Sequence, residues 1–465
     1  MNNLNQNMDI TVIGAGYVGL ISAVCLCEFG FKVWLSDNNR YKIEQLKNGA
    51  YPDSEPGIDQ SLKKHIAAGN LILSSDFTDL VKQSSAIVIA VVTGASKEDS
   101  NLSNLHEVVK DVALSLSKDR YTGIVIKTNL PVGACSIVSH NAKFLRPDLI
   151  PGKHYDIISN PGFLREGVAV HDFMEPSRVL IGLETDSPKA KELVFQIYEP
   201  LARAAVPFIF SSFETVELIR AATIGFVATK MAFINEIADF CDRCNADINM
   251  VIKGIALDQR IGSKALRVSP GFGGSSFPRT VRILSNTAKS LGMDLSIIDS
   301  ALKSNSNRIS SIKTKIMRLV TEDNTSDEKA LKRIAILGLS FKPSTSDVWE
   351  SASALVIEDL LKENNVEVAT YDPLYKPGSV SIKRLPDFVK NHRNFSLVES
   401  AYEAVNQSDI AVIMTNWSEF TSLDFKKIKE LMNKKSDSKP IILDYRNMFL
   451  KSEMSGMFRY ISQGQ

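Results

Sequence analysis

The sequence predicts an α/β protein in which two Rossmann-like, doubly wound domains are joined by a helical core with a long spine helix. Short apolar runs alternate with helical patterns from residue 9 onward, and a second series of the same kind starts near residue 333. These runs are continuous rather than alternating, which is typical of parallel strands covered by helices on both faces. A stretch with helical periodicity and no proline, residues 211–245, separates the two series. Because 465 residues are too many for one core, several domains are expected.

The first series opens with the strand DITVI, which runs into the glycine-rich sequence GAGYVG. A helix follows and is expected to end at Gly30, since glycine commonly terminates helices. Further strands are predicted at residues 31–37, 86–92 and 123–128.

The stretch 211–245 is longer than an average helix, so it predicts a connecting spine with a face that could pair with a second copy of the chain. A polar, charged segment at 321–330 is expected to be an exposed linker. The second series then predicts four strands, at residues 333–341, 366–373, 408–415 and 439–447.

Charge and composition exclude several classes of partner. The chain has 54 Lys plus Arg and 53 Asp plus Glu, a balance that gives no electrostatic reason for a nucleic-acid or membrane partner. A polar N-terminus and the lack of a long apolar run predict a cytoplasmic protein. The five cysteines are odd in number, and the CxxC spacing at 241–244 has no second pair, so neither disulfides nor a metal site are expected.

The GxGxxG pattern at residues 14–19 follows a strand and opens a helix. Gly14, Gly16 and Gly19 would permit a tight turn, close approach of a pyrophosphate to the backbone, and helix–strand packing. Asp37 ends the next strand, where an acidic residue accepts hydrogen bonds from a ribose and favours NAD over NADP. The alternative is a glycine-rich turn that serves packing only. Because the pattern follows one strand, opens a helix and is followed by Asp37 at the end of the next strand, it predicts nucleotide binding.

A second glycine-rich loop, GFGGSSFPRT at 271–280, lies between two predicted helices. Three glycines indicate that main chain closely approaches another group, and the two serines are candidates for chemistry. Taken alone, NPGFLREG at 160–167 is expected to be a loop. GLSFKPSTSDVWES at 338–351 opens the second series, but its single glycine is not a dinucleotide fingerprint, and Lys342 could hold an anionic group or be an ordinary surface residue.

Together, these stretches resemble the nucleotide-sugar 6-dehydrogenases of the UDP-glucose dehydrogenase type, and the likeness covers nearly the whole chain. It rests on GAGYVG and, in order, on EPG (55–57), PVG (131–133), FLREG (163–167), ATK (228–230), FINEIA (233–238), RIG (260–262), GFGGS-FP (271–278), LGLSFKPSTSD (337–347), YDP (371–373) and TNW-EF (415–420). The resemblance implies an NAD-binding Rossmann domain over 1–205, a helical dimerisation domain over 206–320 and a UDP-sugar-binding α/β domain over 330–465.

Members of this family oxidise C6 of the sugar twice, from alcohol through aldehyde to acid, with NAD as the cofactor. The resemblance assigns the cofactor to Gly14, Gly16, Tyr17, Val18, Gly19, Asp37, Lys42, Thr93 and Asn129. It assigns a UDP-sugar such as UDP-glucose to Phe163, Leu164, Arg165, Arg260, Phe272, Gly273, Phe277 and Lys342. Because the family's counterpart of Arg260 reaches the neighbouring subunit's site, a homodimer or larger homo-oligomer is expected.

The catalytic positions of the family are all substituted. Ser276 stands where the family has its nucleophilic cysteine, and Arg279-Thr280 replace its Lys-Asp pair. Gly162 replaces a glutamate, while Arg220 and Ile224 replace a lysine and an asparagine that would share one helical face. A serine hydroxyl without a base is a poor nucleophile, and arginine stays charged rather than exchanging a proton.

Three hypotheses fit these departures. In the first, the chain binds NAD or a UDP-sugar, or both, but lacks the two-step oxidation. In the second, it is an active NAD enzyme with single-step chemistry or another nucleotide sugar. In the third, it is an ordinary UDP-glucose 6-dehydrogenase of polysaccharide precursor synthesis whose lost groups are replaced elsewhere. The pattern of substitutions favours the first.

Overall fold

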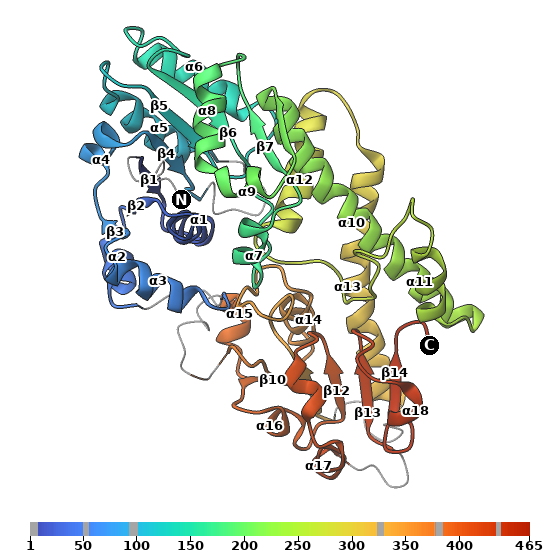
Figure 1. The fold of residues 1–465 in the computed structure, drawn as a ribbon. Coiled ribbons are helices and arrows are strands. Elements are labelled where there is room, and N and C mark those ends of the chain that lie inside the picture. Colours follow the sequence, from blue (N-terminus) through green and yellow to red (C-terminus); the bar gives the residue numbers. More distant parts are fainter. Residues whose placement is uncertain are drawn as a thin grey trace. The chain divides into compact units, whose positions relative to one another are not determined.

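The computed structural model describes residues 8–49, 55–92, 101–322, 330–375, 377, 385–433 and 439–465. The chain forms two compact units, residues 1–223 and 224–465, and each contains one β-sheet (Figure 1). The predicted α/β class with two Rossmann-like sheets and a helical central region is confirmed. The division into three domains stays a prediction, and most of the predicted linker at 321–330 lies outside the described residues.

The first unit is built on an eight-stranded sheet with the order β3-β2-β1-β4-β5-β6-β7-β8. Its strands are β1 (Asp9–Ile13), β2 (Lys32–Ser36), β3 (Leu71–Ser74), β4 (Ala86–Ile89), β5 (Thr122–Ile126), β6 (Tyr155–Ser159), β7 (Val179–Gly182) and β8 (Phe208–Ser211). All neighbours pair in parallel except β6 and β7, which meet antiparallel at Ser159 and Gly182. Gly182 permits this junction, because a Cβ there would lie 3.0 Å from the Ser159 Cβ.

Helices cover both faces of this sheet (Figure 1). They are α1 (Tyr17–Glu28), α2 (Arg40–Lys47), α3 (Ile58–Ala67), α4 (Thr78–Gln83), α5 (Ser103–Ser115), α6 (Ala134–Leu145), α7 (Ala169–Met174), α8 (Pro188–Ile197) and α9 (Glu199–Arg203). Alternate residues of one strand face opposite cores. Val12 packs with α1, α3 and α7, whereas Ile13 packs with α5 and α6. Burial on both faces explains why the strands are continuously apolar.

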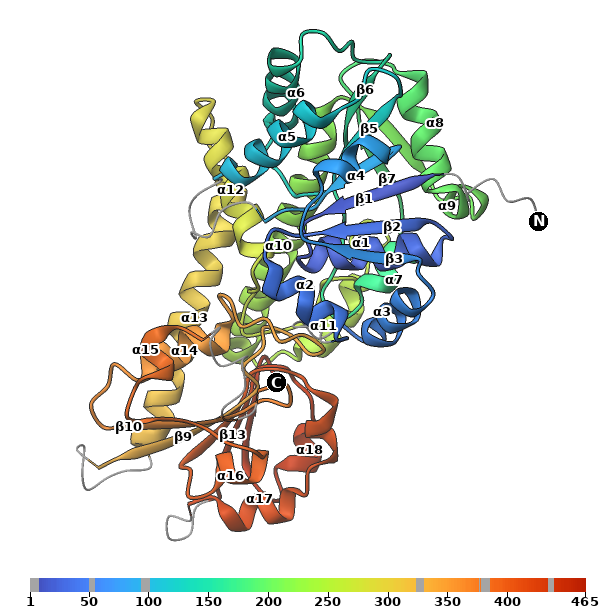
Figure 2. The ribbon, with the colours of Figure 1, turned by 90° about the vertical axis from the view of Figure 1, so that its left-hand side faces the viewer.

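The second unit contains a six-stranded parallel sheet with the order β11-β10-β9-β12-β13-β14. Its strands are β9 (Lys332–Leu337), β10 (Val366–Tyr371), β11 (Phe395–Leu397), β12 (Ile410–Ile413), β13 (Ile441–Asp444) and β14 (Arg459–Ser462). Figure 2 shows this sheet between two helical layers, of which α13 and α14 form one and α16, α17 and α18 the other. The four strands predicted here are confirmed with shorter bounds.

Helices outside the sheet make up much of the second unit. Its helical elements are α11 (Ile248–Ala256), α12 (Phe277–Ser290), α13 (Ser296–Glu322), α14 (Ala352–Leu360), α15 (Asp387–Lys390), α16 (Ala401–Val405), the 3-10 helix η2 (Ser418–Ser422), α17 (Phe425–Leu431) and α18 (Lys451–Met454). The predicted spine is the helix α10 (Phe213–Cys244), which begins in the first unit and ends in the second. Among the described helices, none is long and apolar enough to cross a bilayer.

Candidate functional site

The glycine-rich turn lies at the carboxyl end of β1, next to β4, where the strand order of the first sheet reverses. Gly14 has a φ of +100°, which favours glycine, and its N–H donates to the Ser36 carbonyl at 2.8 Å. A Cβ on Gly19 would lie 1.8 Å from the Gly14 carbonyl oxygen, so α1 can pack this closely only with glycine. Such a switch point is where nucleotides bind in doubly wound sheets.

The Asp37 carboxylate is fixed beside this turn. It accepts the backbone N–H of Ala15 at 2.8 Å and that of Asn39 at 2.9 Å. Lys42 Nζ lies 3.7 Å from the same carboxylate. The structure therefore brings together the turn, Asp37 and Lys42, all of which the sequence assigned to the cofactor.

Tyr17 and Val18 are the first residues of α1, and both are half-buried. The Tyr17 hydroxyl donates to the Glu55 carboxylate at 2.5 Å. Glu55 is buried and also accepts the backbone N–H groups of Gly167 and Ala169, each at 2.6 Å. Glu55 therefore ties the cofactor helix to the 160–167 loop. Glu55 is the first residue of the EPG motif, but the motif itself does not indicate this role.

The other two cofactor residues follow β4 and β5. Thr93 lies outside the described residues. Asn129 follows β5 by three positions, and its Oδ1 is buried without a hydrogen-bond partner. Next to it, the Thr128 hydroxyl donates to the Val91 carbonyl at 3.0 Å, which holds the ends of these strands together. An unpartnered buried acceptor is a feature that a bound ligand could satisfy.

The 160–167 loop contributes the first group of predicted sugar residues. Two guanidinium groups lie near the Phe163 ring, with Arg178 at 4.2 Å and Arg220 at 5.7 Å from its centroid. Leu164 packs on the core of the first unit. Arg165 is mostly exposed and pairs with Asp172 of α7.

Gly162 and Arg220, two of the substituted catalytic positions, are in direct contact. Arg220 is 7% exposed, and its Nε donates to the Gly162 carbonyl at 2.9 Å. Burial lowers the pKa of the Arg220 guanidinium to about 10, so at neutral pH it remains a cation. A Cβ on Gly162 would meet only ordinary contacts, at 3.4 Å or more. The glycine is therefore not required for space at this position.

In the second unit, the loop 271–276 is held at its start by α13. The side-chain amide of Asn305 bonds both sides of Phe272, accepting its N–H at 2.8 Å and donating to its carbonyl at 3.0 Å. Gly271 has a φ of +129°, and its N–H donates to the Ser269 hydroxyl at 3.3 Å.

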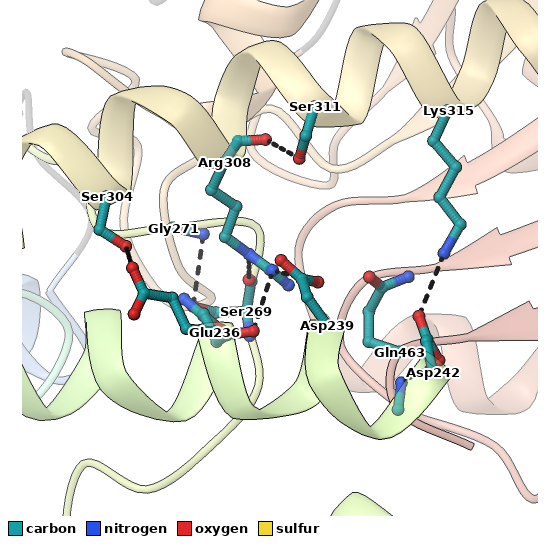
Figure 3. A network of polar contacts seen from close by, with 12 residues as sticks. Glu236, Asp239, Asp242, Ser269, Gly271, Ser304, Arg308, Ser311, Lys315 and Gln463 are labelled. Carbon is teal, nitrogen blue, oxygen red and sulfur yellow. Dashed lines mark hydrogen bonds and ion pairs between the residues drawn. The ribbon is translucent and has the colours of Figure 1, made fainter. Parts of the chain in front are cut away.

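Arg308 extends from α13 toward this loop (Figure 3). Its Nε donates to the Ser269 carbonyl at 2.6 Å, and its Nη1 lies 3.0 Å from the Asp239 carboxylate on α10. Farther along the same two helices, Lys315 and Asp242 form an ion pair at 3.6 Å. The loop is therefore anchored by buried polar contacts to two long helices, a contribution that local sequence did not reveal.

The remaining glycines pack against the segment that follows β9. A Cβ on Gly273 would lie 2.4 Å from the Glu350 carbonyl oxygen, and one on Gly274 would lie 3.0 Å from the Phe341 ring. The N–H of Ser275 donates to the Asp347 carboxylate at 2.7 Å. These glycines accordingly permit close approach of the protein's own chain, and the assignment of Gly273 to the sugar stays a prediction.

Ser276 is exposed and precedes α12 as its N-cap residue, but its hydroxyl caps no backbone N–H. Within the described chain, no basic side chain is hydrogen-bonded to that hydroxyl. Thr280 lies one turn later and donates its hydroxyl to the Ser276 carbonyl at 2.9 Å. The two positions are thus close, but their contact is a helix-terminus hydrogen bond.

Ile224 packs in a small apolar cluster with Phe272, Phe277 and Val281. The Phe272 and Phe277 rings are 5.4 Å apart. Where the family resemblance places an amide, this chain therefore has a hydrophobic contact under the glycine loop.

Lys342 and Arg260 are the last predicted sugar contacts. Lys342 Nζ lies 5.6 Å from the Phe341 ring centroid, near the glycine loop. The Arg260 side chain is 88% exposed and pairs with Asp258 of its own loop at 2.6 Å. Within the described residues, no group of three His, Cys, Asp or Glu side chains could hold a metal ion.

Models of one family match most of the chain. The NAD-binding domain of the UDP-glucose/GDP-mannose dehydrogenase family matches residues 8–202, its central domain residues 214–307, and its UDP-binding domain residues 335–451.

Full-length relatives and solved structures agree with this match. The UDP-glucose 6-dehydrogenase of Rhizobium meliloti is 35% identical over 98% of this chain and 100% of its own length. TuaD of Bacillus subtilis, also a UDP-glucose 6-dehydrogenase, is 35% identical over 96% of this chain and 90% of its own length. The structure of a UDP-glucose dehydrogenase from Pyrobaculum islandicum superposes with a TM-score of 0.82 at 25% identity, covering 100% of this chain and 98% of its own.

Proposed function

Because the chain belongs to the UDP-glucose/GDP-mannose dehydrogenase family, we propose that it binds NAD and a UDP-sugar such as UDP-glucose but does not perform the two-step oxidation of C6. The coarser class, a nucleotide-sugar dehydrogenase similar to UDP-glucose 6-dehydrogenase, follows from the comparisons. The loss of chemistry is the proposal. It rests above all on Ser276, an exposed serine whose hydroxyl has no base bonded to it in the described chain.

The second oxidation needs a nucleophile that adds to the aldehyde, since an aldehyde carries no hydroxyl proton to lose. A thiol with a pKa of about 8.5 supplies a thiolate readily, whereas a serine must be deprotonated by a neighbouring base. Thr280, one helical turn away, is not such a base, and its own hydroxyl is bonded to the Ser276 carbonyl. Ser276 therefore cannot form the thioester intermediate, and its hydroxyl is not activated to add to the aldehyde.

Two other substitutions support the same conclusion. Arg220 holds its proton at neutral pH, so it can stabilise a negative charge but not accept a proton from a hydroxyl. Ile224 has no polar atom on its side chain, and it packs with Phe272 and Phe277. The groups that would move protons and stabilise an oxyanion are thus replaced by a fixed cation and an apolar contact.

NAD is the cofactor of this family's N-terminal domain, and the residues of the glycine turn fit it. Gly14 and Gly19 allow the turn and α1 to pack closely on the main chain around them, and the N-terminus of α1 carries no capping side chain, so its N–H groups can face a pyrophosphate. Asp37 is positioned to accept from the adenosine ribose. When bound, NAD supplies a hydride acceptor.

A second function is favoured by the intact cofactor turn. One alcohol oxidation needs a hydride acceptor and a base but no thiol, so the chain could catalyse a single two-electron step. Absorbance of NADH, measured with UDP-glucose and a panel of nucleotide sugars, separates the alternatives. We expect no NADH above background, while one NADH per sugar would favour the single step. Two per sugar, at the rate of an active UDP-glucose 6-dehydrogenase run as a control, would overturn the proposal.

We further propose that the chain has the three domains 1–205, 206–320 and 330–465 and forms a homodimer or larger homo-oligomer through α10. The support is an exposed apolar stripe on that helix. Phe226, Phe233 and Phe240 recur at seven-residue intervals and are 65%, 51% and 64% exposed. Side chains at this spacing share one helical face, and an apolar stripe of this kind typically marks an interface.

A further inference from the structure

Arg220 is buried although no carboxylate in the described chain pairs with it. Its Nε bonds the Gly162 carbonyl at 2.9 Å, and its Nη1 is buried without any hydrogen-bond partner. Buried guanidinium groups normally have their N–H groups satisfied and their charge compensated, because an unpaired buried charge is strongly destabilising. The described chain thus leaves the Arg220 guanidinium short of an acceptor.

Arg178 is a second cation beside the Phe163 ring. Both guanidinium groups lie over the Phe163 ring, at 4.2 Å for Arg178 and 5.7 Å for Arg220. Arg178 donates to the hydroxyls of Ser177 and Thr223, at 3.1 and 3.2 Å, and among the described residues no carboxylate forms an ion pair with it. Two cations therefore share one aromatic ring, and the protein's own described contacts leave both uncompensated.

A third cation lies close to Gly162. A Cβ on that residue would be 3.9 Å from the Lys127 Cε. Lys127 is buried, and its Nζ donates to Asn160 Oδ1 and the Tyr198 hydroxyl, both at 2.9 Å and both neutral. The cluster of Lys127, Arg178 and Arg220 is thus positively charged, while Gly162 contributes no side chain to balance it.

We propose that Arg220, assisted by Arg178, binds a carboxylate of the sugar ligand, so that the chain prefers a nucleotide uronate over the neutral nucleotide hexose. This inference rests on the proposed function and names the ligand class of the same protein. A planar guanidinium matches a carboxylate with two parallel hydrogen bonds, a geometry that a lysine ammonium does not offer. A ligand carboxylate would supply the acceptor that Arg220 lacks.

The phosphates of NAD and of UDP have candidate sites elsewhere in the chain. The glycine turn fits the pyrophosphate of NAD, and the family's UDP-binding domain lies in residues 335–451. The sugar is the remaining part of a UDP-sugar, and oxidation at C6 is the step that gives it a carboxylate. The cluster therefore selects for the oxidised sugar rather than for another phosphate.

Isothermal titration of the full-length protein with UDP, UDP-glucose and UDP-glucuronate tests this preference. We expect UDP-glucuronate to bind about 10- to 100-fold more tightly than UDP-glucose, the range for a charge-assisted contact. Arg220→Gln should abolish the difference while leaving the affinity for UDP within about twofold. Arg203→Gln is the matched control, because Arg203 is an exposed arginine of the same unit that pairs with Glu199, and it should keep the preference.

The outcomes separate the two proposals. Equal affinities of the wild type for UDP-glucose and UDP-glucuronate, with UDP bound, would overturn the carboxylate site alone. Absence of any UDP binding would overturn the proposed function. In that case, saturation-transfer NMR with free glucuronate and free glucose still tests the carboxylate site. A glucuronate signal that disappears in Arg220→Gln would support the site. Identical signals for both sugars would refute it. Gly162→Glu, which places a carboxylate beside the cluster, should weaken glucuronate binding.

Discussion

The Asp37 carboxylate and the backbone N–H of Ala15 are hydrogen-bonded at 2.8 Å, so the acid at the end of β2 is fixed against the turn between β1 and α1. This contact couples two sequence signals 22 positions apart into one candidate cofactor site. It also leaves the carboxylate close to Lys42, which offsets part of its charge. We therefore expect Asp37 to accept hydrogen bonds from the ribose of NAD and to repel a 2′-phosphate.

We predict that Asp37→Ser weakens NAD binding by about tenfold, because the variant loses a charged acceptor, and that it reduces discrimination against NADP. Calorimetric titration with both nucleotides measures the two effects. Asp59→Ser removes an exposed acid from α3 of the same unit and should change neither affinity. Unchanged selectivity in Asp37→Ser would show that the carboxylate does not contact the ribose.

The glycine loop gives a second prediction. Gly273→Ala should destabilise the protein by about 1–3 kcal/mol, because its Cβ would lie 2.4 Å from the Glu350 carbonyl oxygen and force the two segments apart. Gly254→Ala is the control, since Gly254 lies in the helix α11 with no atom near its Cβ, and it should be neutral or stabilising by up to ~1 kcal/mol. Urea denaturation of both variants measures these changes. Equal free energies of unfolding for Gly273→Ala and the wild type would mean that the loop can shift to accommodate the Cβ without loss of stability.

The substituted positions can be tested by reversing them. Ile224→Asn alone should cost about 1–3 kcal/mol, because it introduces an amide into the apolar cluster with Phe272 and Phe277. The combined variant Gly162→Glu, Arg220→Lys, Ile224→Asn, Ser276→Cys and Thr280→Asp should gain NADH formation with UDP-glucose, whereas Ser276→Cys alone should not. Activity of Ser276→Cys comparable to that of the combined variant would indicate that only the nucleophile was lost.

Sequence patterns could predict the parts of the fold that depend on local order. The turn after β1 and the acid at the end of β2 are predictable because strand, turn and helix follow one another directly, and the helix 213–244 is predictable because its periodicity continues without proline. The strands β3 and β8 cannot be predicted in this way, since their apolar runs, LIL and FIF, are short and most of their residues are only partly buried. Six strands were missed in all: β3, β6, β7, β8, β11 and β14.

Long-range polar contacts could not be predicted either. Glu55 bonds a backbone N–H 112 positions away, and Arg308 bonds a carboxylate 69 positions away. Neither residue belongs to a pattern with a local physical meaning, so only the folded chain reveals that they position the two candidate loops. The proximity of Arg220 to Gly162, 58 positions apart, is of the same kind.

The apolar stripe on α10 predicts an oligomer that one charge can disrupt. Phe233→Glu should shift the protein toward the monomer, because burying an unpaired carboxylate in an interface is unfavourable. Light scattering after size-exclusion chromatography gives the mass, and circular dichroism confirms that the variant stays folded. Phe144→Glu, on the exposed surface of α6 in the first unit, is the matched control. A wild-type protein that is monomeric at micromolar concentration would refute the stripe as an interface.

Glu217 provides a test based on pH. This residue of α10 is 3% exposed, and its carboxylate accepts the N–H groups of Gly133 at 2.6 Å and Cys135 at 2.9 Å, at the start of α6. Desolvation outweighs these bonds and raises the pKa of the Glu217 carboxyl above its usual value. A raised pKa in the folded state means that the contribution of Glu217 is fully present below the unfolded-state pKa and is lost as the pH rises through the folded-state pKa.

The variant Glu217→Gln cannot titrate, so it should lack this component of the pH dependence. It should be less stable than the wild type by about 1 kcal/mol at pH 4.5, because one amide oxygen replaces two acceptors, and the gap should narrow as the pH rises toward 7. Denaturation midpoints at several pH values measure the trend. Glu214→Gln, an exposed acid one turn earlier whose pKa is lowered by its bond to Ser136, should show a gap that widens instead. A gap for Glu217→Gln that also widens with pH would show that the backbone hydrogen bonds, and not desolvation, control this carboxyl.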